Sequence, residues 1–168
     1  IAFGGYMQDA IGLTAKDAFW NIADPGWAYG LYYGITGPLL LGHATLFYEG
    51  GFSTESVCQI VKEYGITNLA GAPTAYRMMM AADPVQMAEL RGKLRVVSSA
   101  GEPLNPEVIR WFEQVLDVPI YDHYGQTEVG MVVCNHHALE HPVRSGAAGL
   151  ASPGYRITVV DEQGHELP

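Results

Sequence analysis

Apolar residues fall along this chain in two kinds of pattern, short continuous runs and runs that repeat every three or four positions. The run over residues 42–51 predicts a short strand ended by glycines. Residues 52–65 predict a helix, because their apolar side chains share one helical face. That face is formed by Val57, Ile60, Val61 and Tyr64. Ser53 or Thr54 is expected to cap the start of the helix, and Gly65 its end.

The same alternation continues to about residue 125. Strands are predicted at residues 66–73, 93–101 and 118–125, and helices at 74–83 and 105–116. Thr74 and Asn105 are the expected N-caps, with Pro106 in the first turn of the second helix. Strands that alternate with helices at this spacing predict an α/β fold, a parallel sheet with flanking helices.

The pattern changes after Pro142. Residues 146–168 are rich in glycine, alternate over Tyr155 to Val160, and contain a Glu-Gln-Gly turn at 162–164. This indicates antiparallel strands. We therefore predict two parts, an α/β part over residues 1–142 and the start of an antiparallel β subdomain over 143–168. Both ends are also expected to be cut, since the chain begins at Ile1 without a methionine and ends as a strand begins.

Composition and charge narrow the class of protein. Hydrophobic residues make up 48% of the 168 residues and charged residues 16%, which is typical of a soluble globular domain. The net charge of −9 disfavours nucleic acid and anionic membranes as partners. Cys58 and Cys134 lie far apart and in no CxxC pattern, which suits a reducing, cytoplasmic location. No apolar run is long enough to predict a membrane span, and no signal peptide is seen.

One short string suggests zinc. Residues 137–141 (HALEH) match the H-x-x-E-H pattern of some zinc peptidases, with Cys134 and His136 nearby. Pro142 would stop the helix that such a site needs, so a polar surface loop is the favoured interpretation. In the Pro-Gly turn around residue 25, the pattern by itself favours a turn aspartate at Asp24 and a core tryptophan at Trp27.

Two loops carry more chemistry together than either does alone. SAGEP (99–103) and YGQTE (124–128) each follow a predicted strand. The carboxyl ends of parallel strands gather ligands, so both loops are expected at one edge of the sheet. They offer backbone beside a planar surface, an aromatic ring, a hydroxyl and a carboxylate. Such groups could hold an aromatic base, a phosphate and Mg²⁺.

At this point the chain resembles the adenylate-forming superfamily of acyl-CoA synthetases, luciferases and peptide-synthetase adenylation domains. The matching segments stand in family order from about Gly5 onward: ADPGW, GHATLFYEG, GAPTAYRMM, SAGEPLNPE, YDHYGQTE and ITVVDEQGHELP. FYEGG and the region of Trp27 point toward the acetyl- and medium-chain acyl-CoA synthetases.

The resemblance implies an enzyme that activates a carboxylic acid with ATP and passes the acyl group to CoA, and it implies roles for particular residues. Thr127 would bond the α-phosphate, Glu128 would hold Mg²⁺, and both are the expected catalytic residues. The expected nucleotide-binding residues are Gly101, Glu102, Pro103, Asp122, His123, Tyr124, Gly125, Gln126 and Thr127. The expected acyl-pocket residues are Trp27, Ala28, Tyr29, Ala100 and Gly125.

The departures from the family pattern matter as well. The phosphate loop should precede Ile1, and the ribose-binding aspartate, hinge and C-terminal domain should follow Pro168, so the 168 residues alone are expected to be inactive. Gly125 stands where acetate-specific relatives have tryptophan, so acids longer than acetate are expected, and Gly125→Trp is expected to restore preference for acetate. A domain that loads a carrier protein, or a stand-alone nucleotide-binding module, remains an alternative. The sequence does not name the acid or the oligomeric state.

Overall fold

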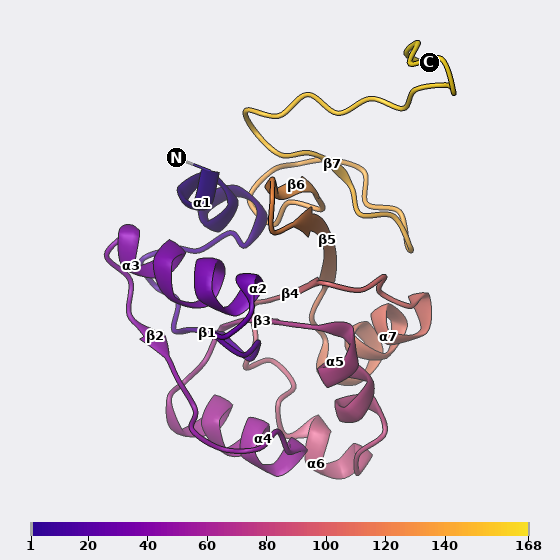
Figure 1. Cartoon of the computed structure of the whole chain (residues 1–168). Coiled ribbons are helices and arrows are strands. Elements are labelled where there is room, and N and C mark those ends of the chain that lie inside the picture. Colours follow the sequence, from indigo (N-terminus) through magenta and orange to yellow (C-terminus); the bar gives the residue numbers. More distant parts are fainter. Residues whose placement is uncertain (1, 168) are drawn as a thin grey trace.

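The computed structural model describes residues 2–167, which form a sheet of seven strands with helices on both faces (Figure 1). The strand order is β2-β1-β3-β4-β5-β6-β7. Their bounds are β1 Phe19–Asn21, β2 Thr45–Leu46, β3 Asn68–Gly71, β4 Val96–Ala100, β5 Ile120–Gln126, β6 Gly130–Cys134 and β7 Leu150–Ala151. The pairs from β2 to β5 are parallel, whereas β6 and β7 are antiparallel to their neighbours. The predicted α/β class, with a parallel sheet and antiparallel strands at the end, is confirmed.

Helices cover both faces of the sheet. Their bounds are α1 Ala2–Gly5, α2 Ala28–Gly30, α3 Gly37–Leu40, α4 Thr54–Glu63, α5 Pro73–Met80, α6 Pro84–Ala88 and α7 Pro106–Trp111, with wider π-helical turns at Tyr6–Ala10, Leu31–Thr36 and Phe112–Leu116. In Figure 1, α1 to α3 lie on one side and α4 to α7 on the other. Neighbouring residues of β1 face opposite sides, so that Phe19 joins the core with α1 and Trp20 joins the core with α4.

The predicted caps are partly confirmed. Ser53 caps α4, because its Oγ accepts a hydrogen bond of 3.1 Å from the backbone N–H of Ser56. Gly65 follows the helix with a φ of +61°, a conformation that glycine adopts without strain. Asn105 caps α7 by accepting a 3.0 Å bond from the N–H of Glu107.

The expectation that Thr74 caps α5 is wrong. The helix begins one residue earlier, at Pro73, and its flanking residue Ala72 has no side-chain cap. Proline suits the first helical position because it has no N–H to satisfy there. The Thr74 hydroxyl is thereby free to donate 2.9 Å to Glu102 at the end of the neighbouring strand.

Three helical segments were not predicted. Residues 2–10 and 28–40 are rich in glycine and aromatic residues, which weakens the helical signal. The short helix α6 did have a recognisable start, since Asp83 accepts a 2.9 Å bond from the N–H of Val85 and Pro84 follows it directly.

The C-terminal region departs from its prediction in one respect. Antiparallel pairing begins at β6, and β7 extends the same sheet. Residues Tyr155 to Val160 do not form the expected strand, and only Val160 pairs, in a single antiparallel bridge with Glu166. Val159 is 68% exposed, so this stretch has no core against which alternating side chains could pack. The turn at 162–164 is present, with the N–H of Gly164 donating to the carbonyl of Asp161.

The domain boundary between residues 142 and 143 stays a prediction, and its outer limits, Ile1 and Pro168, lie outside the described residues.

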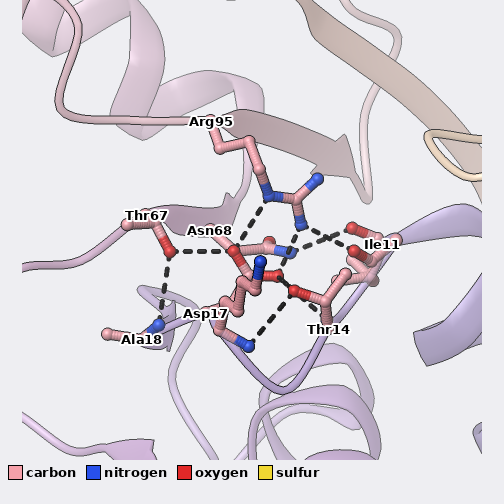
Figure 2. Close-up of polar contacts among 9 residues, drawn as sticks. Ile11, Thr14, Asp17, Ala18, Thr67, Asn68 and Arg95 are labelled. Carbon is pink, nitrogen blue, oxygen red and sulfur yellow. Dashed lines mark hydrogen bonds and ion pairs between the residues drawn. The ribbon is translucent and has the colours of Figure 1, made fainter.

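A polar cluster ties the amino ends of three parallel strands together (Figure 2). Asp17, just before β1, is 2% exposed at its side chain and pairs with Arg95, just before β4. Its carboxylate also accepts bonds from Thr14 and from Thr67, which precedes β3. Asn68, the first residue of β3, donates 3.0 Å to the carbonyl of Ile11. The loop from α1 is thus fixed to the sheet at the end opposite the predicted ligand loops.

Within residues 2–167, every helix is too short or too polar to cross a membrane.

Candidate active site

The two ligand loops lie side by side at the carboxyl edge of the sheet. β4 ends at Ala100 and leads into Gly101–Pro103, while β5 runs parallel beside it, with Ala100 opposite His123. β5 then turns at Thr127–Val129 into β6, so YGQTE lies at a hairpin. The predicted proximity of the two loops is confirmed.

A cavity of about 320 Å³ lies between these loops. It brings together seven of the residues expected at the nucleotide: Gly101, Glu102, Pro103, Asp122, His123, Tyr124 and Gly125. The remaining wall comes from Gly146 and Ala148, which sequence reasoning missed. Their glycine- and alanine-rich stretch was treated as the start of another subdomain, although small residues that let a ligand approach backbone were a usable signal.

Asp122 supplies this cavity with an unpaired acceptor. Its Oδ2 accepts a 3.2 Å bond from the N–H of Leu104, whereas its buried Oδ1 has no partner among the described residues. Burial raises the pKa of the carboxyl to about 6, although hydrogen bonds from the backbone of Leu104 and His123 oppose the rise. At neutral pH the group is therefore mainly ionised and can accept from a ligand N–H. A buried acceptor without a partner is costly, which favours a ligand that satisfies it.

The aromatic wall is held in place by its neighbour in the motif. Gln126 donates a 2.9 Å bond from Nε2 to the hydroxyl of Tyr124, whose ring is 50% exposed. Gly101, which lines the same cavity, turns the chain away from β4 with a φ of +100°, a conformation that favours glycine. A cavity lined by an exposed ring and glycine backbone suits a flat aromatic ligand.

Glu102 is anchored to α5 at the rim of this cavity. It accepts bonds of 2.9 Å from the Thr74 hydroxyl and 2.7 Å from Arg77 Nη2. The hydrogen bond from Arg77 lowers the pKa of the Glu102 carboxyl. The SAGEP loop is thereby fixed to the helix that follows β3.

A second cavity, of about 600 Å³, shares Gly101, Glu102 and Gly125 with the first. It contains all five residues expected at the acyl group: Trp27, Ala28, Tyr29, Ala100 and Gly125. Residues that were missed complete it, chiefly Tyr32, Tyr33, Ala72 and Met131. Small residues and aromatic rings alternate around it, so the space is mainly apolar.

The structure confirms the prediction for Asp24 but not the prediction for Trp27. Asp24 is a turn residue as predicted, since its Oδ1 accepts a 2.6 Å bond from the N–H of Gly26. The expectation from the local pattern that Trp27 is a core residue is wrong, because its side chain is 76% exposed. It follows the Pro-Gly turn at the rim of the second cavity, where little of residues 2–167 covers it.

Two tyrosines and a histidine form a hydrogen-bonded line beside the second cavity, and the ring of a third tyrosine, Tyr33, packs against both tyrosines. Tyr29 and Tyr6 have hydroxyl oxygens 3.3 Å apart, and the Tyr6 hydroxyl is 2.8 Å from Nδ1 of His123. Tyr33 accepts a 3.0 Å bond from the N–H of Met131, and burial raises its pKa to about 12. Burial also lowers the pKa of His123 to about 3, so its ring is neutral at physiological pH.

Gly125 lines both cavities, but the expected effect of Gly125→Trp needs correction. A Cβ at this position would meet the carbonyl oxygen of Gly130 and lie 2.6 Å from Met131 Sδ and 2.8 Å from Met131 Cα. The pairing with β6 is irregular between Tyr124 and Gly125, which brings the strands close here. An indole would therefore displace β6 before it could close the cavity, and the substitution is not a clean test of acid size.

Thr127 and Glu128 occupy the turn between β5 and β6, and both are exposed. Thr127 lines the second cavity, whereas Glu128 lines neither of the two. No hydrogen bond joins either side chain to another of residues 2–167, so both are available to a ligand.

The predicted surface loop over residues 137–141 is confirmed at Ala138 to Glu140, which are exposed, whereas the flanking His136 and His137 face inward. His136 is 3% exposed and its backbone N–H donates to Nε2 of His141, while His137 stacks on Tyr121 with ring centroids 4.2 Å apart. These rings pack inward because residues 135–138 are hydrogen-bonded to β5 and to the π-helical turn Tyr6–Ala10. Among residues 2–167, no three His, Cys, Asp or Glu side chains are grouped as a metal site would need.

Comparison with known proteins decides the family. The family described as AMP-binding enzyme matches residues 1–168. The chain belongs to this family. The acetyl-coenzyme A synthetase of Bacillus subtilis is 40% identical over 158 residues, which are 93% of this chain and 27% of that enzyme. The mitochondrial acyl-coenzyme A synthetase ACSM3 of Mus musculus is 35% identical over 159 residues, 93% of this chain and 26% of that enzyme.

Comparison with solved structures of acyl-CoA synthetases and CoA ligases supports the same family assignment. An acyl-CoA synthetase of Brucella canis superposes with a TM-score of 0.98 and is 65% identical, covering 99% of this chain and 31% of its own. A benzoate CoA ligase from Burkholderia xenovorans LB400 reaches a TM-score of 0.80 at 27% identity, covering 97% of this chain and 33% of its own. The chain thus spans about a quarter of the length of the curated relatives it matches.

Proposed function

We propose that this chain forms the adenine- and acyl-binding part of an AMP-forming carboxylic acid–CoA ligase. The observation that carries the proposal is the junction of two cavities at Gly101, Glu102 and Gly125. The first cavity is lined by the half-exposed ring of Tyr124 and by Asp122, whose carboxylate has one oxygen without a partner among the described residues. The second cavity is mainly apolar. An acyl-adenylate has the same two parts joined at one phosphate. The relatives named as acetyl- and acyl-CoA synthetases support this assignment.

Each residue of the two cavities has a role that follows from its chemistry. The carboxylate of Asp122, which lines the cavity, accepts from the exocyclic amine of adenine, and Tyr124 stacks on the base while Gln126 holds the Tyr124 ring. His123 supports this wall from behind. Pro103 and Glu102 keep the facing loop in position through Thr74 and Arg77.

The reaction begins when an oxygen of the carboxylate attacks the α-phosphorus of ATP. The new oxygen–phosphorus bond forms as the bond to the β-phosphate breaks, and pyrophosphate leaves with that electron pair. Thr127, at the edge of the acyl cavity, donates its hydroxyl to an α-phosphate oxygen as negative charge builds there. The thiol of CoA then loses its proton to solvent as its sulfur attacks the acyl carbon. The carbon–sulfur bond forms, the bond from the acyl carbon to the phosphate oxygen breaks, and AMP leaves with that electron pair.

Mg²⁺ fits this site only together with the nucleotide. Glu128 offers one exposed carboxylate in the turn beside Thr127, and residues 2–167 contain no larger cluster of metal ligands. One carboxylate plus substrate phosphates is a usual way to bind Mg²⁺. When bound, the ion would neutralise phosphate charge.

The cytoplasmic location expected from the sequence stays a proposal, and we also propose a place in fatty acid metabolism, since the resemblance is to acyl-CoA synthetases.

The proposal is tested on the full-length enzyme with acetate, butyrate, hexanoate and benzoate. We expect AMP and acyl-CoA to form in equal amounts, with both ATP and CoA required. Activity with ATP and acid that stops at the adenylate until a carrier protein is added would instead show a carrier-loading domain. Failure of every acid in a folded enzyme would contradict the proposal.

Filling the acyl cavity should change acid preference. Ala28 lies on its wall at the start of α2. Ala28→Leu should lower kcat/KM for hexanoate relative to butyrate by about one power of ten, because pocket contacts discriminate by roughly 1–3 kcal/mol per methylene. Ala88→Leu, at an exposed position of α6, is the matched control and should leave the ratio unchanged. If Ala28→Leu leaves the ratio of kcat/KM for hexanoate to that for butyrate unchanged, this cavity does not bind the acyl group.

A further inference from the structure

A continuous line of hydrogen bonds runs behind the two cavities. It begins at the hydroxyl of Tyr29, passes to Tyr6 and His123, and reaches the backbone of Asn135. Tyr6 comes from the first π-helical turn, far in sequence from β5, and is 3% exposed. It lines neither cavity, so no contact with a ligand accounts for its hydroxyl.

The direction of each bond follows from the last acceptor. A backbone carbonyl carries no hydrogen, so His123 Nε2 must donate to the carbonyl of Asn135, 2.8 Å away. The ring is neutral, which leaves Nδ1 as an acceptor, and the hydroxyl of Tyr6 donates to it. The oxygen of Tyr6 can then accept from the hydroxyl of Tyr29. Only this assignment of donors and acceptors gives each hydroxyl and each ring nitrogen in the line a hydrogen-bond partner.

Asn135 connects the line to the nucleotide cavity. Its Nδ2 donates 2.6 Å to the carbonyl of Ala147, whose neighbours Gly146 and Ala148 line that cavity. Its backbone and side chain also donate to the carbonyl of Asp122. The inner end of the line is therefore fixed to β5 and to the 146–148 stretch, and Tyr29 is the end that faces substrate.

We propose that Tyr6, held by His123, is a positioning residue that fixes the Tyr29 ring in the wall of the acyl cavity and thereby sets the size of acid accepted. The inference rests on the proposed function. Apart from Trp27, which is 76% exposed at the rim, Tyr29 is the bulky residue among those expected at the acyl group, since the others are Ala28, Ala100 and Gly125. Without the hydrogen bond that its hydroxyl donates to Tyr6, the Tyr29 ring can swing and admit larger acids.

The test is Tyr6→Phe in the full-length enzyme, which removes one oxygen and keeps the ring. We expect kcat/KM for benzoate or hexanoate relative to acetate to rise about fivefold, the value of one ordinary hydrogen bond, while KM for ATP stays within about twofold. Tyr29→Phe breaks the same line from the cavity end and should give a shift of similar size. Because both changes break one line, the double variant should shift no further than either single variant.

Tyr76→Phe is the matched control. It also removes a buried hydroxyl, one that donates 2.7 Å to the carbonyl of Ser98, but it lines neither cavity. It should lower the thermal midpoint without changing the ratio of acids. Unchanged ratios in both Tyr6→Phe and Tyr29→Phe, or shifts that multiply in the double variant, would overturn the proposal.

A crystal structure of Tyr6→Phe separates this inference from the proposed function, because it needs no activity. A displaced or disordered Tyr29 ring supports the positioning role, and a ring that stays in place overturns it. If no acid is activated by the parent enzyme, the proposed function fails, and this structural outcome still decides whether Tyr6 positions Tyr29.

Discussion

Thr127→Ala in the full-length enzyme is expected to lower kcat for adenylate formation by a factor on the order of 10²–10³, the usual loss when one donor to a developing charge is removed. Thr127 lies at the edge of the acyl cavity, beside the cavity assigned to adenine, and its hydroxyl makes no bond within residues 2–167. Its loss should therefore cost little folding stability. KM for the acid should change much less than kcat, because the bond strengthens as charge builds on the α-phosphate.

Glu128→Ala should have an effect of similar size, together with a higher Mg²⁺ requirement. Adenylate formation is followed by pyrophosphate release with and without CoA over a range of Mg²⁺ concentrations. Thr158→Ala and Glu162→Ala change the same residue types at exposed positions of the C-terminal stretch and serve as controls. Wild-type turnover in either Thr127→Ala or Glu128→Ala would remove that residue from the catalytic assignment.

The second large effect is on stability. Asp17→Asn is expected to lower the free energy of unfolding by about 2 kcal/mol, the scale for losing hydrogen bonds to one charged group, because the Asp17 side chain is 2% exposed while that of Arg95 is 43% exposed. The carboxylate accepts from Arg95, Thr14 and Thr67 at the amino ends of β4, β1 and β3 (Figure 2). An amide in its place would turn N–H groups toward these donors. Urea unfolding of the parent and variant enzymes measures the difference.

Glu166→Gln provides the contrast, since it also removes one partner of an arginine pair. Arg156 is 77% exposed and Glu166 50% exposed at the side chain, so the loss should stay below about 1 kcal/mol. If the two substitutions lower the free energy of unfolding by the same amount, burial does not determine how much the Asp17–Arg95 pair stabilises the fold.

The Asp17 effect should depend on pH in a defined window. Burial alone raises the pKa of its carboxyl, but hydrogen bonds from Arg95, Thr14 and Thr67 outweigh burial and lower the pKa to about 2. Because the folded pKa is depressed, the carboxylate stabilises the fold fully above about pH 4, and this contribution is lost as the pH falls toward 2. The gap in stability between parent and Asp17→Asn should close over that range. A gap that is independent of pH would show that shape, and not charge, holds the cluster.

Local sequence determined most of the scaffold. Period-3.6 and continuous apolar runs were enough for α4, β3, β4, α7 and β5, and the caps Ser53 and Asn105 marked helix starts. These signals succeed because hydrogen bonds within one turn and burial of one face act over a few residues. They failed at Tyr155 to Val160, where alternation was present but no partner strand or core was. They also failed over residues 28–40, where glycines weaken the helical signal and packing stabilises the helix.

Part of the candidate site could likewise be predicted from the sequence, and part was determined only by the tertiary structure. The SAGEP and YGQTE loops could be placed together from sequence, since parallel strands end at one edge of a sheet, and motif resemblance supplied their roles. Only the folded chain brought Tyr6 beside His123, 117 positions away, or placed Gly146 and Ala148 in the same cavity as Tyr124. Only the fold showed that a side chain at Gly125 would meet β6. Such contacts depend on packing between segments that are distant in the chain, and no local pattern of apolar and polar residues records which distant segment will be the neighbour.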